Sequence, residues 1–593
     1  MLATMPRHAR QRVRLAISVF ERSTFPRRFS TLPLERRTAH IERMERSPVS
    51  LRRDLALLLK TLTCFAWGRD PAVQAAVGVK PCCSVSAAAD DPGWDPLAPP
   101  LDPATLRAGD DVERCDVVVV GSGAAGATAA RVLAERGLDV IVLEQGSYHD
   151  AASYSTDPLE AVRTLYRDGG LTYCEGRPAI PLPVGRCVGG TTVVNSGTCL
   201  RPPADVLGRW RDEYGIDWAT ELDAELEAVE RALHVAPVDP ATAGRNAELC
   251  RRGAEALGAS NGPLPRNAGR VSRCGTCPTG CAIDAKQAAH VSELPRAVAA
   301  GARVRADVRV ERVLVEQGRA AGVVAATGSG EGSYEVRARA VVLAAGALGT
   351  PELLLRQGLA NRSGHVGRHL RVHPACWVGA LYDEEVRGWE GVMQSWYVDE
   401  WSDRGLFLEA TFTPLPFGAH WLHGAGPAFE RRLERFDRLA VIGVHLSEQS
   451  EGRVRVRGGQ LRVGHDLLRA DAAALRFGIA RAADIHFAAG AREVYPQVGR
   501  IPSLAPGEQG PLLDRGRVRP SELRLEAFHP MGTTRMASDP GASVVGPSGE
   551  AHDVAGLYVT DASVFPTAVK VNPMVTIMAC ARRVAAGLAE RLS

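Results

Sequence analysis

Residues Asp116 to Gly146 read DVVVVGSGAAGATAARVLAERGLDVIVLEQG, and this stretch decides the fold of the chain. It begins with a short β-branched run that ends at glycine, which predicts a buried parallel strand. The motif G-x-G-x-x-G follows, at Gly121, Gly123 and Gly126. In order, these glycines permit a tight turn, the approach of a pyrophosphate, and close packing of the alanine-rich helix that comes next.

The same unit continues with a second strand, Leu138 to Leu143, which Glu144 ends. A carboxylate about 20 residues beyond the glycines is placed to bind the hydroxyl pair of a ribose. The amides at the start of the helix would point toward the phosphates. Strand, glycines, helix, strand and acid in this order predict a dinucleotide-binding domain.

Composition limits the remaining possibilities. The chain has 593 residues, of which 45% are hydrophobic and 23% charged, enough for two or more domains. A net charge of +3 is too balanced to indicate a nucleic-acid partner. The 13 cysteines are scattered, so we expect most of them to be reduced and the protein to be cytoplasmic. The sequence contains no apolar run long enough to predict a membrane span.

The region before the nucleotide motif, residues 1–110, is expected to form a helical extension followed by a linker. Leu51 to Trp67 has helical periodicity, whereas Ala87 to Pro103 is rich in Asp and Pro. This extension could pack on the catalytic body, lie on a membrane surface or bind a partner. We favour packing, and peripheral membrane contact through these helices stays a second possibility.

The nucleotide-fold pattern returns later in the chain. Arg303 to Ala325 alternates as strand, turn and strand, and Ala338 to Gly346 predicts another buried parallel strand that leads into a helix. This order is typical of the discontinuous arrangement of flavin-binding proteins, and not of a simple nicotinamide domain.

From about Val372 the pattern changes to that of an antiparallel sheet. Ala375 to Leu381, Leu406 to Thr413 and Leu439 to Leu446 alternate in the manner of such strands, and a long amphipathic helix follows at Leu467 to Ala489. We expect this second domain to cover the substrate.

A cysteine-rich segment, C-x2-C-x3-C, lies at Cys274, Cys277 and Cys281. It looks like a metal site, but a structural zinc site needs four ligands and no fourth cysteine follows at regular spacing; His290 could serve. The alternative is a tight loop of buried thiols, with or without one disulfide. We favour the loop and expect no metal.

Taken together, the motifs resemble the glucose–methanol–choline (GMC) family of flavin oxidoreductases over about residues 112–593. The matching stretches are GSGAAGATAARVLAERGLDVIVLEQG, GRCVGGTTVVN, VVLAAGALGTPELLL, HPMGTTRM and GLYVTDASVFPTAVKVNPMVTIMA. Within the family, the NPM motif, the cysteine segment and the N-terminal extension are most similar to long-chain fatty alcohol oxidases. The resemblance implies FAD and the oxidation of an alcohol to a carbonyl.

It also implies an α/β fold: a discontinuous Rossmann-like FAD-binding domain, an α+β substrate domain with an antiparallel sheet, and an N-terminal helical extension. The expected divisions are 1–110 for the extension and linker, 111–205, 265–371 and 522–593 for the FAD-binding domain, 206–264 for a substrate or cap segment, and 372–521 for the substrate-binding domain.

Carried over onto this sequence, the family motifs imply a cofactor site and a catalytic pair. The ADP half of FAD would be held by the first glycine motif and Glu144, the flavin half by the later motifs, and His529 and Asn572 would face the flavin. The residues expected to bind FAD are Gly121, Ser122, Gly123, Gly126, Glu144, Gly189, Gly190, Asn195, Val308, Ala345, Gly346, Asp561, Ala562, Asn572 and Pro573.

The proposed pair suits alcohol oxidation, which removes a hydroxyl proton and a hydride. His529 has the right side chain for the base, and the amide of Asn572 can donate to the substrate oxygen. We expect a long-chain or apolar primary alcohol as substrate and oxygen or an external carrier as electron acceptor. Alternatives are a sterol-type or other alcohol dehydrogenase with a non-oxygen acceptor, a non-redox lyase, and a fatty acid photodecarboxylase.

Overall fold

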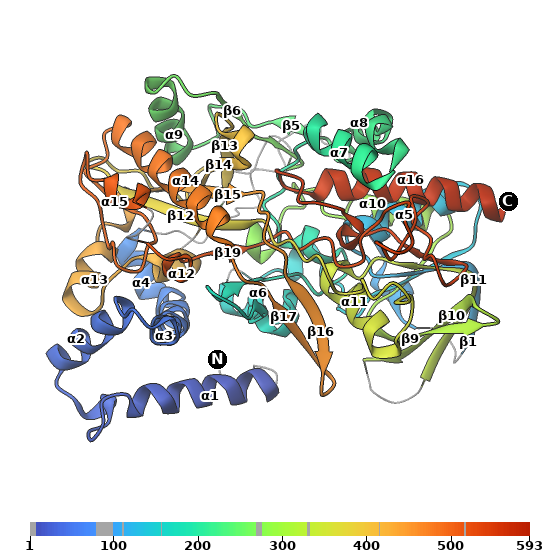
Figure 1. Cartoon of the computed structure of the whole chain (residues 1–593), viewed down its shortest axis with the longest axis horizontal. Coiled ribbons are helices and arrows are strands. Elements are labelled where there is room, and N and C mark those ends of the chain that lie inside the picture. Colours follow the sequence, from blue (N-terminus) through green and yellow to red (C-terminus); the bar gives the residue numbers. More distant parts are fainter. Residues whose placement is uncertain are drawn as a thin grey trace.

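The computed structural model describes residues 7–78, 99–108, 112–155, 157–268, 275–328, 333–413, 415–514 and 518–593. Two seven-stranded sheets organise these residues, each with its own hydrophobic core. We call them the nucleotide sheet and the substrate sheet; Figure 1 shows the first on the right and the second on the left. The expected combination of an α/β domain, a domain with an antiparallel sheet and N-terminal helices is confirmed.

The nucleotide sheet is assembled from distant parts of the chain. Its strand order is β8-β2-β1-β11-β10-β9, and β20 also pairs with β11. The strands β8, β2, β1, β11 and β20 are parallel, while β10 pairs antiparallel with β9 and β11. The bounds are β1 (Val112–Val120), β2 (Val140–Leu143), β8 (Arg303–Arg305), β9 (Val308–Glu316), β10 (Arg319–Thr327), β11 (Ser333–Leu343) and β20 (Leu557–Val559).

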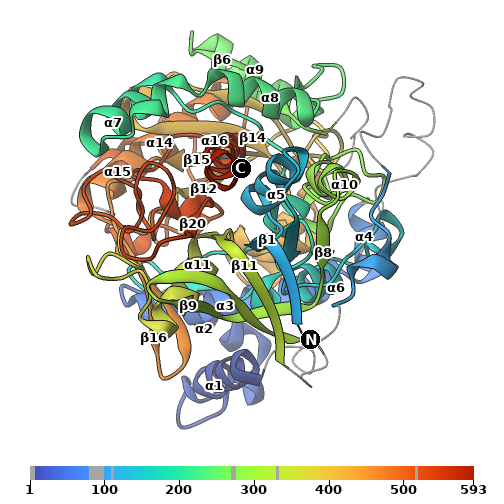
Figure 2. The ribbon, with the colours of Figure 1, turned by 90° about the vertical axis from the view of Figure 1, so that its right-hand side faces the viewer.

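The helices of this domain are α5 (Ala124–Glu135), α10 (Glu293–Ala299), α11 (Gly346–Gln357) and α16 (Met574–Leu592). Helix α16 packs against α5, and Figure 2 shows the two close together beside β1 and β11. Val575, Met578, Ala585 and Leu588 recur at helical spacing along α16 and are all buried, which explains this docking.

The substrate sheet has the order β18-β12-β15-β14-β13-β6, with β19 paired to β12, and its pairings are antiparallel. The three long strands follow the sequence prediction closely, whereas the shorter ones had no clear alternating pattern. The bounds are β6 (Asn261–Pro263), β12 (Pro374–Leu381), β13 (Gln394–Val398), β14 (Leu406–Thr411), β15 (Leu439–Leu446), β18 (Glu493–Tyr495) and β19 (Glu526–Ala527).

The two faces of the substrate sheet differ. Helices α9 (Arg245–Ala256) and α14 (Arg469–Ala488) pack on one face, over side chains such as Ile442 and Val444. Because side chains alternate along a strand, Val441 and His445 point to the opposite face. That face carries the polar residues described below.

The N-terminal helices are α1 (Arg7–Arg22), α2 (Leu34–Glu45), α3 (Ser50–Gly68) and α4 (Pro71–Val77). They pack on the substrate domain, as expected. Lys60 of α3 lies 2.9 Å from Glu45 of α2, and its ammonium also donates to the carbonyl of Gly424 at 2.7 Å. Much of the predicted linker lies outside the described residues. Among the helices that the structure describes, none has the length and apolar character of a membrane span.

The remaining elements connect the two domains or cover them. They include β3 (Tyr173–Cys174), β4 (Ile180–Pro181), β5 (Ala236–Pro237), β7 (Pro265–Arg266), β16 (Arg453–Arg457), β17 (Gln460–Gly464), α6 (Pro158–Leu165), α7 (Ala204–Tyr214), α8 (Asp223–Ala232), α12 (Leu415–Gly418), α13 (Gly426–Leu433) and α15 (Gly510–Leu513).

Candidate active site

The turn between β1 and α5 requires glycine for steric reasons. A Cβ on Gly121 would lie 2.4 Å from the carbonyl oxygen of Ala344, and one on Gly126 would lie 1.9 Å from that of Gly121. Gly121 also has a φ of +103°, in the region that favours glycine. Gly123 is the N-cap residue of α5 and no side chain caps the helix, so the first amides of the helix remain available to an anion.

A second glycine turn lies against the first. Gly190 is so close that its Cβ would stand 2.9 Å from Cα of Gly123. The amide of Gly189 donates to Oγ of Ser122 at 3.0 Å, and the amide and hydroxyl of Ser122 donate to Oε2 of Glu144 at 3.1 and 2.7 Å. The structure therefore brings together residues from two of the motifs found in the sequence.

Glu144 is buried at the end of β2, and its other oxygen accepts the amide of Gly146 at 2.9 Å. Burial raises the pKa of this carboxyl, and the hydrogen bonds from Ser122 and Gly146 oppose the rise. Oε2 already accepts two bonds from Ser122, whereas Oε1 accepts one and can accept another, so a ribose hydroxyl can still be bound there. Val308 begins β9 beside this residue, and its amide donates to the carbonyl of Glu144 at 2.8 Å.

The turn between β11 and α11 is tied to the C-terminal strand. Oδ2 of Asp561 accepts the amide of Gly346 at 2.9 Å and the hydroxyl of Thr350 at 2.5 Å, while Oδ1 accepts the amide of Ser563 at 2.8 Å. Burial raises the pKa of Asp561, and these bonds oppose that rise. Asp561 thus fixes the turn at Gly346 relative to its own strand.

The neighbours of these two residues occupy the same turns. Ala345 is the N-cap residue of α11, and the carbonyl of Ala562 accepts the amide of Gly532 at 3.0 Å. Asn572 and Pro573 immediately precede α16 and are buried. The amide of Asn195 lies 3.1 Å from the sulfur of Met574, so the second glycine loop reaches the start of that helix.

Two further residues lie at this site: Lys286, which carried no sequence signal, and His290, which the sequence suggested only as a possible metal ligand. Lys286 is 2% exposed, and its ammonium donates to the carbonyls of Val193 at 2.8 Å and Asn195 at 2.5 Å, which places a positive charge under the second glycine loop. His290 lies beside Gly189 and its Nε2 is 2.9 Å from the hydroxyl of Tyr154. Burial, and to a lesser extent Lys286, lowers the pKa of His290 to about 3.

These contacts bear on the cysteine segment. Nε2 of His290 lies at hydrogen-bond distance from the hydroxyl of Tyr154, and among the described residues His290 belongs to no group that could hold a metal ion. Cys277 and Cys281 form no disulfide, and Cys274 lies outside the described residues. The sulfur of Cys277 lies 3.3 Å from Arg266, and that of Cys281 accepts the amide of Lys286 at 3.4 Å.

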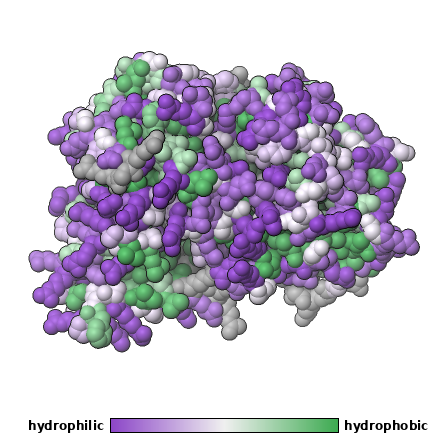
Figure 3. Space-filling view, viewed as in Figure 1, coloured by the Kyte–Doolittle hydropathy of each residue, from purple (hydrophilic) through white to green (hydrophobic). Residues whose placement is uncertain are grey.

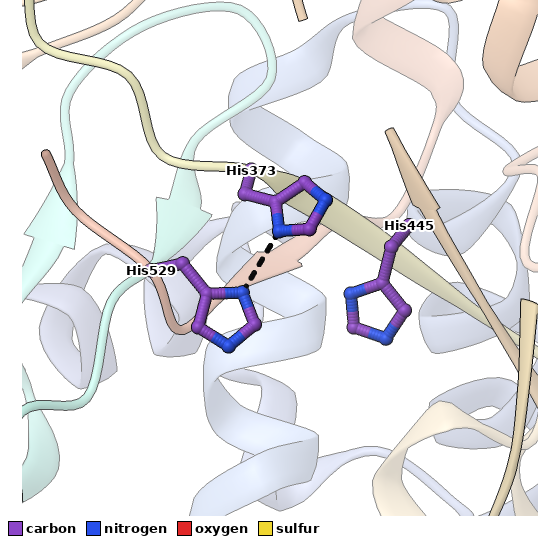
Figure 4. Close-up of side chains that lie close together, drawn as sticks. All are labelled: His373, His445 and His529. Carbon is purple, nitrogen blue, oxygen red and sulfur yellow. Dashed lines mark hydrogen bonds between the residues drawn. The ribbon is translucent and has the colours of Figure 1, made fainter. Parts of the chain in front are cut away.

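His529 lies beside a second histidine because of strand pairing. β19 pairs antiparallel with the start of β12, which sets Pro374 opposite Ala527, and Arg371 then bridges to Met531. Between these pairs, His373 and His529 meet, with 2.9 Å between their Nδ1 atoms (Figure 4). No sequence motif indicated that the segments of His373 and His529 would lie side by side.

Further polar side chains lie on the same face of the substrate sheet. His445 on β15 approaches both other rings, with centroids 5.5 Å from His373 and 6.1 Å from His529. Nε2 of His445 lies 2.9 Å from Oε2 of Glu409 on β14. His373, His445 and Glu409 were not expected from the sequence, although the last two interrupt otherwise apolar strands.

Burial sets the protonation of this group. The pKa of His529 is lowered to about 3, mainly by burial and further by the charge of His445. The pKa of His373 is lowered well below its usual value, first by burial, then by His529 and His445. Near neutral pH both rings are therefore uncharged, the state in which an imidazole can accept a proton.

The uncapped helix, the double glycine turn and the buried Glu144 define a dinucleotide-binding fold of the Rossmann type. Family models agree: an FAD binding domain matches residues 116–156, and the two GMC oxidoreductase models match residues 162–375 and 448–581. The chain belongs to the GMC oxidoreductase family and binds FAD.

Individual relatives support this assignment. An uncharacterised GMC-type oxidoreductase of Mycobacterium tuberculosis is 42% identical over 480 residues, which are 80% of this chain and 76% of that protein. A long-chain-alcohol oxidase of Arabidopsis thaliana is 31% identical over 498 residues, 79% of this chain and 67% of that protein. The structure of a formate oxidase from Aspergillus oryzae shares the fold, with a TM-score of 0.63 and 17% identity over 82% of this chain and 99% of that one. The roles of the single residues named above stay predictions.

Proposed function

We propose that this FAD-dependent oxidoreductase oxidises a long-chain or otherwise apolar primary alcohol to the aldehyde. The observation that carries the proposal is the position of His529 at the edge of an aromatic cluster. Phe528, its neighbour in the chain, packs edge-on against Trp377 with 6.1 Å between ring centroids. The buried members of this cluster include Trp377, Leu381, Trp389, Phe412, Trp421, Phe436 and Val441.

The aromatic cluster favours an apolar substrate over a sugar. Trp377 and Val441 lie on the face of the substrate sheet that also carries His445, so apolar and proton-accepting groups are adjacent. An alkyl chain would find contacts here that a polyol would not. The similarity to long-chain-alcohol oxidases of Arabidopsis thaliana supports the same substrate class.

The residues divide the chemistry as follows. Bound FAD supplies the hydride acceptor. Nε2 of His529 has no hydrogen bond within the described residues and takes the hydroxyl proton, for which its neutral state suits it. The amide of Asn572 donates to the substrate oxygen as negative charge develops on it. Oxygen or an external carrier would be the final electron acceptor.

Anaerobic reduction of the flavin by a panel of alcohols tests the proposal. We expect bleaching of the flavin band that accelerates as the chain of a primary alcohol lengthens, and recovery of the band with air or with a quinone. Bleaching by sugars alone would contradict the apolar substrate. If no alcohol reduced the flavin, the proposed oxidation of an alcohol would be wrong. The lyase and photodecarboxylase hypotheses would then be tested next.

A further inference from the structure

The cluster of His373, His445, His529 and Glu409 is unusual for its burial. His373 and His445 are 1% and 2% exposed, and Glu409 is fully buried. Nε2 of His373 and both oxygens of Glu409 form no hydrogen bond, although Glu409 lies within ion-pair distance of His445. Unpaired buried polar groups are costly, so such a group persists when it has a function.

The backbone around the cluster is also specialised. Val372 and His373 stand opposite Phe528, His529 and Pro530, a local irregularity of the kind that redirects side chains near active sites. His373 has a φ of +53°, a conformation that non-glycine residues rarely adopt and that concentrates at functional positions. Both features aim the imidazole of His373 at that of His529.

The three histidines could in principle bind a metal ion, because one nitrogen from each lies within 4.8 Å of the others. A tetrahedral zinc ion with bonds of about 2.0–2.1 Å would separate its nitrogen ligands by about 3.3 Å. The Nδ1 atoms of His373 and His529 are only 2.9 Å apart, which is a hydrogen-bond distance. The geometry therefore favours a shared proton over a shared metal.

We propose that His373 is a positioning residue for the base, and that Glu409, acting through His445, supplies its countercharge. His373 accepts a hydrogen bond from Nδ1–H of His529, which leaves the lone pair of His529 on Nε2, facing the alcohol. When Nε2 takes the hydroxyl proton, the resulting positive charge is offset by the carboxylate of Glu409. This inference rests on the proposed function and adds the residues that prepare its base.

Other charged groups around the cluster are accounted for. Glu448 accepts the amides of Val372 and His373, so it contacts their backbone and not the ring. Burial raises the pKa of Glu448 to about 7 against those hydrogen bonds. Glu526 of β19 accepts from Trp377 at 2.8 Å. Among the carboxylates that the structure describes, Glu409 is thus the one within ion-pair distance of the histidine cluster.

Variants of His373 separate positioning from mere packing. His373→Ala removes the acceptor, and we expect roughly 10²-fold slower anaerobic flavin reduction, within the range for a disabled base. His373→Asn keeps an oxygen near the position of Nδ1 and should restore the rate to within roughly tenfold of the wild type. His486→Asn is the control, because it changes a buried histidine that bonds to Val378 elsewhere. Equal losses in both His373 variants would overturn the proposal.

Glu409→Gln tests the countercharge through the pH profile. Without the carboxylate, the base holds its proton less tightly, so the acid limb of the reduction rate should move to lower pH while the plateau falls. A change in packing alone would lower the plateau and leave the limb in place. An unmoved limb therefore contradicts the role given to Glu409.

The tautomer can be read without any alcohol. NMR of the FAD-loaded protein with ¹⁵N-labelled histidine, assigned with His373→Asn and His529→Asn, should show His529 protonated at Nδ1 near neutral pH. A proton on Nε2 instead, or stoichiometric zinc in the purified protein, would overturn the inference. If the tautomer is as expected but no alcohol reduces the flavin, the proposed function fails and the hydrogen bond stands.

Discussion

Asp561 accepts a hydrogen bond from the amide of Gly346 across 2.9 Å, although 215 residues separate the two in the sequence. One carboxylate therefore holds the strand-to-helix turn of the central sheet against the last strand of the chain. Asp561→Ala would leave the amide of Gly346 and the hydroxyl of Thr350 unpaired in a buried site. We expect a loss of about 1–3 kcal/mol for each unsatisfied group and a lower FAD content, measured by thermal unfolding and by absorbance of the purified protein.

The first glycine motif gives a sharper steric test. Gly126→Ala places a methyl group 1.9 Å from the carbonyl oxygen of Gly121, so we expect the variant to lose FAD or fail to fold. Gly587→Ala is the matched control, since a Cβ there meets nothing within 4 Å and alanine is a better helix former by about 1 kcal/mol. If Gly126→Ala kept a full complement of FAD, the assigned geometry of the turn would be wrong.

The assignment of the base predicts that His529→Ala still binds FAD yet reduces it roughly 10²–10⁴-fold more slowly with alcohol. Asn572→Ala should slow reduction less, because it removes an oriented donor and not the base. The double variant should cost less free energy than the sum if the two act together. Anaerobic stopped-flow absorbance measures all three, and a wild-type rate in His529→Ala would refute the role of His529.

Buried histidines predict acid sensitivity. Burial lowers the pKa of His465 and His486 to about 4, and that of His290 and His529 to about 3. Below pH 6.5 the unfolded chain binds protons that these folded residues do not. Stability therefore rises with pH across the window from about 4 to 6.5 and is lost as the pH falls. Melting temperature recorded against pH checks this expectation.

Acids whose pKa is raised by burial act in the opposite direction. Burial raises the pKa of Glu448 to about 7 and that of Asp284 to about 6, and it also raises the pKa of Glu144 and Asp561, so these acids stabilise the fold on acidification. The histidines whose pKa burial lowers, which also include His373 and His423, outnumber them, and we expect a net loss of stability. A melting temperature that stayed level down to pH 4 would show that the acids compensate.

The N-terminal helix predicts contact with lipid. Leu15 and Val19 are 66% and 51% exposed one helical turn apart on arginine-rich α1, and Phe25 just beyond it is 87% exposed. Figure 3 shows hydrophobic and hydrophilic surface mixed at the lower left, where Figure 1 places the N-terminal helices. We propose that this segment lies on anionic membranes, attracted by its arginines.

Vesicle co-sedimentation tests this contact. Replacing Leu15 and Val19 by Glu should release the protein from anionic vesicles and leave flavin reduction unchanged. Leu257→Glu is the control, because Leu257 is 48% exposed at the end of α9. Equal binding of all variants, or none by the wild type, would exclude α1 as a lipid-binding element.

Much of the fold was predictable because its signals are local. The glycine motif, the acid at Glu144 and the long alternating runs of the substrate sheet each occupy one continuous stretch. Short strands such as β6 and β19 have too few residues to show a period, so pairing with longer strands defines them.

Residues of the candidate site could be predicted when they belong to a sequence motif. Residues that only tertiary contacts bring to the site could not. The sequence indicated His529 through its motif, but His373 meets it only because β19 pairs with β12. Lys286 likewise reaches the glycine loop from a segment without a recognised pattern. Tertiary contacts of this kind have no signature in a single sequence.

The nucleotide sheet also constrains how the protein is made. Strand β1 is synthesised long before the elements that finish its sheet. Its neighbour β11 pairs on the other side with β20, and α5 is covered by α16, which ends at Leu592. A growing chain therefore carries an unfinished FAD-binding domain until β20 and α16 have been synthesised. We expect FAD to bind only after that point, and the unfinished domain exposes apolar surface until then.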